Sequence, residues 1–178
     1  MDVNQGHLPI DELTALSSDQ LCDMGMEIID SDEQEAGYLR AVSCFQIAAE
    51  RDHALSQFCL GQCYEYGLGV ELNHATAMNW YERAARQQVA EAQYRLGWLY
   101  RNGVDGERDD KKCVAWLERA AYSGVVDAQY LLGWMYRNSS GVKPDAEKAL
   151  KWMRCAAESG HPDAAREYMY MEQLVGRT

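Results

Sequence analysis

The chain has 178 residues, 47% of them hydrophobic, and a formal net charge of −11. That length fits one ordinary domain or one short repeat array, and it is enough for a real core. No stretch approaches the roughly 18 consecutive apolar residues of a membrane span, and the first residues have neither a basic head nor an apolar run. We therefore expect a cytoplasmic protein without a signal peptide.

The acidity belongs to the N-terminal end. Residues 1–39 contain ten Asp and Glu and no Lys or Arg, which leaves 18 acidic and 17 basic residues from Arg40 onward. An acidic end repels phosphate groups, which weighs against nucleic acids and anionic membranes as partners. We expect residues 1–17 to form an acidic N-terminal tail, and a solvated cap is the simplest interpretation of such a charge block.

From about residue 18 to residue 160 the sequence repeats with a period of 36. A glycine after Leu or Met recurs in step, and a tyrosine, a tryptophan and a pair of alanines follow it at fixed distances. The recurring positions are Gly25, Gly61, Gly97 and Gly133; Tyr64, Tyr100 and Tyr136; Trp80, Trp116 and Trp152; and Ala48–Ala49, Ala84–Ala85, Ala120–Ala121 and Ala156–Ala157. A fixed period of about 20 to 50 residues indicates a solenoid of stacked structural units.

Each period predicts a first helix, which we call helix A. In the third copy, residues 90–103 place Leu96, Gly97 and Tyr100 at helical spacing, and the final glycine stops the helix. Gly97 removes side-chain bulk where two helices cross closely, while Leu96, Tyr100 and Trp116 fill the space beside it. A glycine inside a helix destabilises the helix by about 1 kcal/mol relative to Ala. Four glycines at the same position of the repeat are therefore better explained by packing than by catalysis.

A second helix, helix B, follows in each period. Residues 109–124 place Trp116 and the Ala120–Ala121 pair on one side, with Asp109 or Asp110 as the N-cap. The few β-branched residues form no alternating run, and none of the three prolines falls inside a predicted helix. The sequence therefore predicts an all-α protein.

The ends of the B helices differ between copies. Gly124 and Gly160 can take the left-handed conformation that closes a helix. Asp52 and Gln88 replace this glycine in the earlier copies, so we expect those helix ends to be less tightly turned.

The C-terminus begins like one more helix A. Residues 161–174 follow the pattern, but Met169 stands where the packing glycine would be. A terminal helix with no next unit to pack against is typical of a cap. We assign residues 18–175 to a single solenoid of about four helix pairs and a C-terminal capping helix, and residues 176–178 to a tail.

The helix pairs resemble Sel1-like repeats, relatives of tetratricopeptide repeats that share the L-G-x-x-Y core and have a longer loop between the helices. The matching segments are LGWLYRNG with KKCVAWLERAAYSG, and LGWMYRNSSGVKPDAEKALKWMRCAAESG; the first full unit carries the G-x-G-V loop of the family at Gly67, Gly69 and Val70. The resemblance covers nearly the whole chain. It implies a right-handed α-α superhelical solenoid of antiparallel helix pairs, which serves as an interaction scaffold and holds a protein or peptide on a concave side lined by A helices.

A second stripe on the A helices is the candidate binding surface. Trp98 lies about 160° around the helix from Leu96, so it points away from the packing face. The stripe contains Tyr94, Trp98, Arg101, Tyr130, Trp134, Arg137, Arg166 and Tyr170, with Phe58, Gln62 and Glu65 at the same positions in the earlier unit. Tyr, Trp and Arg dominate binding hot spots, and these positions resemble those that line the groove of tetratricopeptide relatives. The alternative is that the stripe is only core between units.

Nothing in the sequence indicates catalysis or a cofactor. The four histidines fall in the N-terminal tail or in predicted turns, and the sequence has no nucleophile elbow, HExxH motif or P-loop. The six cysteines follow no paired spacing, and we expect reduced thiols. Cys59 and Cys63 could share a metal at helical spacing, but they lack the matching ligand pair of a zinc site, so we predict no metal.

Two hypotheses for function follow. In the first, the protein is a non-enzymatic adaptor that binds another protein or a peptide through a groove around Trp98 and Trp134. In the second, it is a dedicated inhibitor, such as the immunity partner of a secreted bacterial toxin, and its acidic first 39 residues plug a basic active site.

Overall fold

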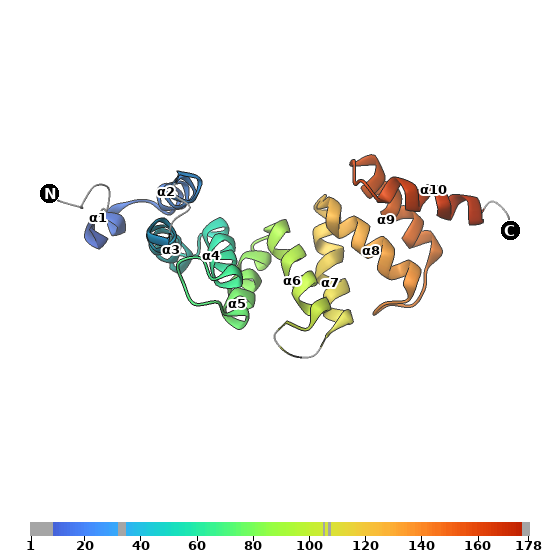
Figure 1. Ribbon diagram of the computed structural model, residues 1–178, viewed down its shortest axis with the longest axis horizontal. Coiled ribbons are helices and arrows are strands. Elements are labelled where there is room, and N and C mark those ends of the chain that lie inside the picture. The colour runs from blue at the N-terminus through green and yellow to red at the C-terminus, as the bar shows by residue number, and fades with distance from the viewer. Residues whose placement is uncertain (1–8, 32–34, 105, 107, 176–178) are drawn as a thin grey trace. The chain divides into compact units, whose positions relative to one another are not determined.

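The computed structural model describes residues 9–31, 35–104, 106 and 108–175. Over these residues the chain forms ten helices and no strand, which confirms the predicted all-α class (Figure 1). The helices are α1 (Ile10–Ala15), α2 (Ser18–Ser31), α3 (Glu35–Glu50), α4 (Ala54–Tyr66), α5 (His74–Arg86), α6 (Ala90–Asn102), α7 (Asp110–Tyr122), α8 (Val126–Asn138), α9 (Ala146–Glu158) and α10 (Ala164–Val175).

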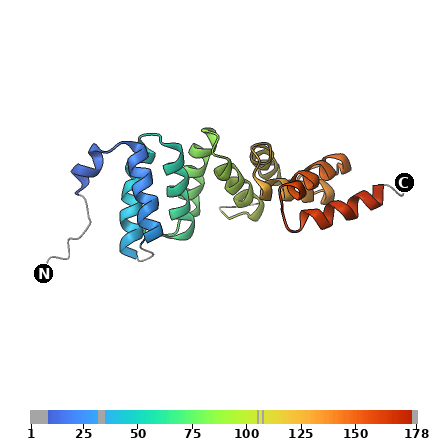
Figure 2. The same cartoon turned by 90° about the horizontal axis from the view of Figure 1, so that it is seen from above.

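The predicted alternation of A and B helices is present along the chain. Helices α2, α4, α6, α8 and α10 are A helices, and α3, α5, α7 and α9 are B helices. Each A helix from α2 to α8 packs against the B helix that follows it, and the hairpins of α2–α3 and α4–α5 lie side by side (Figures 1 and 2). The backbone divides into two compact units, residues 1–89 and 90–178, which we call the N-terminal unit and the C-terminal unit.

The N-terminal unit begins with α1, which lies within the segment that we expected to be a tail. Leu13 is buried against Leu21 and neighbouring side chains of α3. The guanidinium of Arg51 donates hydrogen bonds to the carbonyl oxygens of Thr14 and Leu16, each at 2.6 Å. These contacts fix the end of α1 to the helix pair, and residues 1–8 of the expected tail lie outside the described residues.

In every helix pair the glycine of helix A faces one large side chain of helix B. A Cβ atom placed on any of these glycines would lie 3.0 Å or less from that side chain. The four pairs are Gly25–Phe45, Gly61–Tyr81, Gly97–Leu117 and Gly133–Met153. The packing role predicted for the glycines is confirmed, but the bulk opposite them comes from the residue after the B-helix tryptophan position. Trp116 itself is only half-buried.

The expectation of loose helix ends at Asp52 and Gln88 is wrong. Both residues adopt the left-handed conformation, with φ of 67° and 68°, as Gly124 and Gly160 do at 91° and 87°. At both non-glycine positions, the amide of the next residue donates to the carbonyl four residues before the turn, at 3.1 Å and 3.2 Å. This bond closes the helix end although a side chain in that conformation costs about 1 to 2 kcal/mol.

Three of the B helices have an N-cap residue at the same position of the repeat. The Asp109 carboxylate accepts a hydrogen bond from the Lys112 amide at 3.0 Å, so Asp109 rather than Asp110 is the cap. Asn73 and Asp145, one period before and after, cap α5 and α9 in the same way. A side-chain acceptor there satisfies one of the unpaired amides at the start of each helix.

The C-terminal unit ends with α10, which packs against α9. Ala164 and Met171 of α10 are buried in the core of this unit. Met169, at the glycine position of helix A, is 60% exposed. The face of α10 that carries Met169 therefore remains open, whereas the corresponding faces of α6 and α8 are covered by their B helices.

Candidate functional site

The eight candidate residues lie on α6, α8 and α10 of the C-terminal unit, and we call them the A-helix stripe. They are Tyr94, Trp98, Arg101, Tyr130, Trp134, Arg137, Arg166 and Tyr170. Trp98 is 37% exposed and Tyr170 is 51% exposed. Tyr94, Tyr130 and Trp134 are half-buried and pack against the core of the unit. The stripe therefore has an inner part that contacts the core and an outer part that is open to solvent.

Arginine side chains link the successive A helices within the stripe. The guanidinium carbon of Arg101 on α6 lies 4.9 Å from the ring centroid of Trp134 on α8. Arg137 on α8 lies 5.4 Å from the ring centroid of Tyr170 on α10. Each exposed contact of this kind contributes about 0.5 to 1 kcal/mol, and its planar geometry favours one orientation of both partners. The stripe is therefore ordered by contacts that the repeat itself generates.

The three arginines of the stripe differ in their ion pairs. Arg137 pairs with Glu167 of α10. Arg166 pairs with Asp163 at 2.9 Å. Arg101 forms no ion pair with any residue that the structure describes. Its guanidinium instead makes a cation–π contact with the ring of Trp134. A positive charge on the stripe is therefore left without a neighbouring carboxylate in the described part of the chain.

Three residues that support the stripe were not singled out from the sequence. The side-chain amides of Asn102 and Asn138 donate to the backbone carbonyls of Trp98 and Trp134, each at 2.8 Å. These bonds lie in the last turns of α6 and α8, and each joins the side chain of the last residue of the helix to the backbone four residues earlier. The recurrence of Asn after Arg with the 36-residue period was the available signal.

The third supporting residue is His161, which the sequence places in a turn. Its ring stacks on Tyr130, with ring centroids 4.0 Å apart. It also lies 3.7 Å from a carboxylate oxygen of Asp127. No spacing rule predicted this contact, because the turn and helix α8 are brought together only by the fold.

The corresponding positions in the N-terminal unit have a different character. Glu65, at the place of Arg101 and Arg137, is buried and accepts a hydrogen bond from the Tyr81 hydroxyl at 2.5 Å. The ring of Phe58 packs against Tyr81 at a centroid distance of 5.7 Å. These residues contribute to packing within the N-terminal unit, so the arginines of the stripe are confined to the C-terminal unit.

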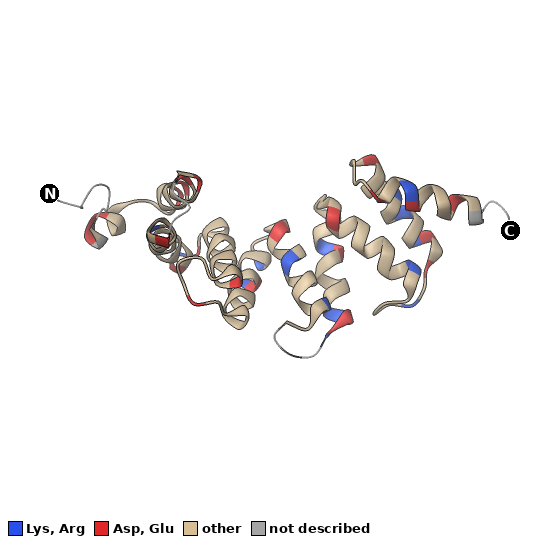
Figure 3. Ribbon diagram, in the orientation of Figure 1, with Lys and Arg blue, Asp and Glu red and all other residues tan. Residues whose placement is uncertain are grey.

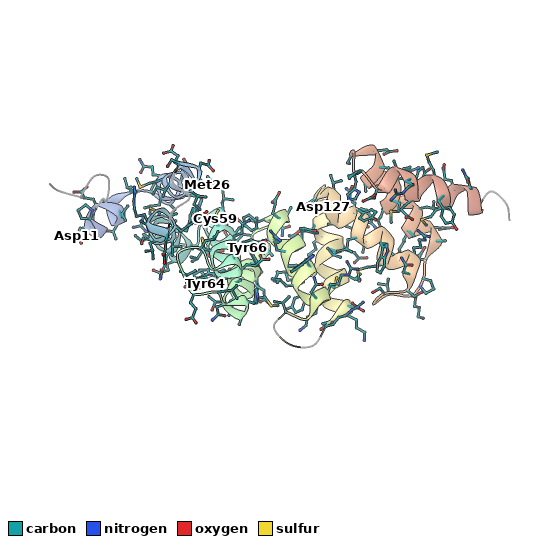
Figure 4. All side chains as sticks on the ribbon, viewed as in Figure 1. Asp11, Met26, Cys59, Tyr64, Tyr66 and Asp127 are labelled. Carbon is teal, nitrogen blue, oxygen red and sulfur yellow. The ribbon has the colours of Figure 1, made fainter. Side chains whose placement is uncertain are left out.

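All six cysteines are free thiols. Cys59 on α4 and Met26 on α2 line the same apolar cluster, which contains Cys22 (Figure 4). A hydrogen bond from Cys59 lowers the pKa of Cys22 to about 6 against the effect of burial, whereas the same contact and burial raise the pKa of Cys59. Burial raises the pKa of Cys63 to about 11. Among the described residues, no three His, Cys, Asp or Glu side chains are grouped so that they could hold a metal ion.

The two units differ in charge. The N-terminal unit has 4 basic and 15 acidic residues, a net charge of −11, and the C-terminal unit has 13 of each. Figure 3 marks the positions of Asp and Glu in red on the ribbon, and they include positions on α1 and α2. Those of α2 are exposed and spaced by three or four residues, and they are Asp19, Asp23, Glu27 and Asp30. Like charges at this spacing repel one another along one helix face.

Comparison with known proteins identifies the architecture. Sel1 repeats are recognised at residues 23–53, 54–89, 90–125 and 126–161. The chain belongs to the Sel1 repeat family. The last three repeats each begin with an A helix and end after the following B helix, which confirms the resemblance and the 36-residue period. Sel1 repeat proteins are generally scaffolds for protein–protein interaction.

Solved structures of Sel1 repeat proteins share the fold. A Sel1 repeat protein from Oxalobacter formigenes is 29% identical, with a TM-score of 0.76 over 85% of this chain and 62% of that protein. A protective antigen present in uropathogenic Escherichia coli strains, which displays an SLR fold, is 24% identical, with a TM-score of 0.79 over 85% of this chain and 33% of the antigen. The chain thus spans about a third of the antigen and less than two thirds of the Oxalobacter protein. No curated protein matches it.

None of the helices that the structure describes combines the length and the apolar character that a membrane span requires.

Proposed function

We propose that this Sel1 repeat protein is a non-enzymatic scaffold or adaptor that binds a peptide or partner protein in a groove lined by the A-helix stripe. The observation that carries the proposal is the exposure of Trp98 and Tyr170 beside arginines that rest on aromatic rings. Such side chains combine a large rigid surface with a polar group, and they supply most of the binding energy at protein interfaces. The residues extend over three helices, which suits a peptide or a protein surface.

The inner part of the stripe supports this role. Trp134 is held between the Arg101 guanidinium and the core, and the Asn138 amide donates to its backbone carbonyl. Tyr130 is held by its stack on His161. Side chains that are already ordered lose little conformational freedom when a partner binds, so a larger share of the contact energy appears as affinity.

Affinity capture from the native cell, read by mass spectrometry, tests the proposal. The wild-type chain and Trp98→Ala are compared side by side. Because Trp98 is 37% exposed and lies at the outer part of the stripe, its truncation leaves the core contacts of Trp134 in place. We expect the variant to keep its helical content and to lose the partner. Equal recovery of the partner by both chains would remove the stripe as the binding surface.

Tyr122→Ala is the matched control. Tyr122 is an aromatic residue of the same unit, 71% exposed, but it lies on the B helix α7 and packs edge-on against Trp152. Removing it takes away an exposed aromatic side chain from a B helix, and Tyr122 is more exposed than Trp98. Partner capture should be unchanged in this variant.

A second candidate function is inhibition of a basic protein, such as a secreted bacterial toxin. The observation that favours it is the placement of the whole net charge of −11 in the N-terminal unit, with four exposed acidic side chains along α2. A surface of one sign steers an oppositely charged partner and makes association depend on salt. Replacing Asp19, Asp23, Glu27 and Asp30 by their amides should then weaken partner binding and flatten its salt dependence. Unchanged affinity and salt dependence would exclude this role.

A further inference from the structure

We propose that Arg101 is the receptor for a carboxylate side chain, an Asp or Glu, in an acidic peptide segment of the partner. This inference rests on the proposed function of the A-helix stripe and names the chemistry that the stripe recognises. It follows from a comparison of two repeats of the same chain, one of which contains the carboxylate that the other lacks.

The later repeat shows the complete arrangement. The guanidinium of Arg137 lies over the ring of Tyr170, and the same guanidinium pairs with the carboxylate of Glu167. The aromatic ring supports one face of the planar group, and its edge remains available for hydrogen bonds to the carboxylate. Here α10 supplies both the ring and the acid.

The earlier repeat shows the same arrangement without the acid. The guanidinium of Arg101 lies over the ring of Trp134, one period before the pair of Arg137 and Tyr170. The position one period before Glu167 is Leu131, a buried apolar residue. Arg101 therefore has the aromatic support but no acidic neighbour among the described residues.

The surroundings of Arg101 fit a peptide that carries an acid next to an apolar side chain. Trp98 lies one turn before Arg101 on α6 and is 37% exposed. An apolar side chain of the partner can cover this ring while its acid meets the guanidinium. Because Glu167 fills the equivalent place in the chain itself, a side-chain carboxylate is favoured over a phosphate as the ligand.

The experiment is selection of a random peptide display library on the full-length chain, followed by affinity measurements with the best synthetic peptide. We expect the selected peptides to be enriched in Asp or Glu beside an apolar residue. Arg101→Gln should weaken binding of that peptide about tenfold or more, the scale of one hydrogen-bonded charge. Arg101→Lys keeps the charge but not the planar fork, and it should restore only part of the affinity.

Two variants use the geometry of the repeat as an internal test. Leu131→Glu places an acid where Glu167 stands one period later, so the new carboxylate should pair with Arg101. The affinity for the peptide should then be about tenfold lower than in Leu131→Gln, whose side chain has the same shape without the charge. Glu167→Gln removes the acid from Arg137. Peptides selected on that variant should carry a second acidic residue.

Arg119→Gln is the matched control, since Arg119 lies over Trp116 of its own B helix at 4.7 Å. It should bind the peptide as the wild type does. The inference is overturned if Arg101→Gln binds as tightly as Arg119→Gln, or if the amide form of the peptide's acidic residue binds the wild type equally well. If either result is found and Trp98→Ala still abolishes binding of the peptide, the proposed function of the stripe survives but the recognition of a carboxylate by Arg101 does not. If Trp98→Ala binds the peptides as the wild type does, or if the library yields no peptide, both proposals are overturned.

Discussion

The contact between Gly97 and Leu117 gives a quantitative test of how the helix pairs pack. A Cβ atom at position 97 would lie 2.8 Å from two atoms of the Leu117 side chain, which is completely buried. Leu117 cannot move into solvent, so Gly97→Ala must displace packed atoms. Overpacking of this kind costs about 1 to 3 kcal/mol. The helix propensity of Ala returns about 1 kcal/mol, so the net destabilisation is about 0 to 2 kcal/mol.

Removing the opposing side chain should reverse the sign of this effect. Leu117→Ala alone costs about 2 to 5 kcal/mol. In that background the nearest remaining atom is the Cys113 carbonyl oxygen, 3.3 Å from the added Cβ. Gly97→Ala should then stabilise the chain by up to about 1 kcal/mol through helix propensity. The coupling between the two substitutions is therefore about 1 to 3 kcal/mol, which is the overpacking cost itself.

Urea unfolding of the four chains, followed by tryptophan fluorescence, measures this coupling. Four of the five tryptophans lie in the C-terminal unit, so the signal reports mainly on the unit that contains the substitutions. If Gly97→Ala has the same effect in both backgrounds, the glycine is not required by Leu117. The packing argument for the 36-residue period would then be refuted.

Further outcomes concern the helix ends, the buried thiols and the attachment of α1. Gln88→Gly should raise the free energy of unfolding by up to about 1 kcal/mol, because it removes a side chain from the left-handed region. Asp52→Gly should gain less, since the Asp52 carboxylate accepts a hydrogen bond from the Gln57 amide at 2.8 Å; equal gains in urea midpoint would contradict this. The free energy of unfolding should fall as pH rises above about 9, because burial holds the pKa of Cys63 at about 11 and of Cys113 at about 12 while an unfolded thiol releases its proton near 9.0. Cys113→Ala should flatten this fall in urea titrations at pH 8 to 11, and an unchanged slope would show that Cys113 is not its source. Arg51→Ala should speed amide hydrogen exchange in α1 and leave α4 and α5 unchanged, because it removes two bonds of 2.6 Å to the end of α1; equal protection in both chains would mean that Leu13 alone holds this helix.

The period and the helices could be predicted because stacking requires the same small residues in each copy. The glycine at position 97 and the alanine pair at positions 120 and 121 recur as the same residues in the other copies, so the repeat is visible without a structure. The side chains opposite the glycines were missed for the converse reason. The four opposing side chains are all large and buried but differ in identity; they are Phe45, Tyr81, Leu117 and Met153. A comparison of residue identities therefore pointed to the half-buried Trp116 instead.

The character of the stripe could be predicted only in part. Helical phase gives the direction of Trp98 and Trp134 from the packing face, but both residues have the same phase. Their exposure differs because coverage depends on neighbouring elements that a single-helix pattern does not contain. The contact of Arg101 with the ring of Trp134, 33 residues later, likewise arises only because the fold brings these two side chains together.

Helix ends show the same limit of local rules. A glycine at the turn is a strong signal, and its replacement by Asp52 or Gln88 suggested a looser end. The backbone hydrogen bonds that close the turn are the same in all copies, so the fold imposes the left-handed conformation on these residues. The strain this causes is small against the packing energy of a helix pair.

The most direct test of the proposed binding surface is photo-crosslinking in the native cell. A photoreactive phenylalanine analogue replaces Trp98 in one chain and Tyr122 in another; both positions are exposed aromatics of the C-terminal unit, on helices A and B. We predict a crosslinked partner protein from position 98 and none of it from position 122. Crosslinking of the same partner from position 122, with none from position 98, would contradict binding through the A-helix stripe.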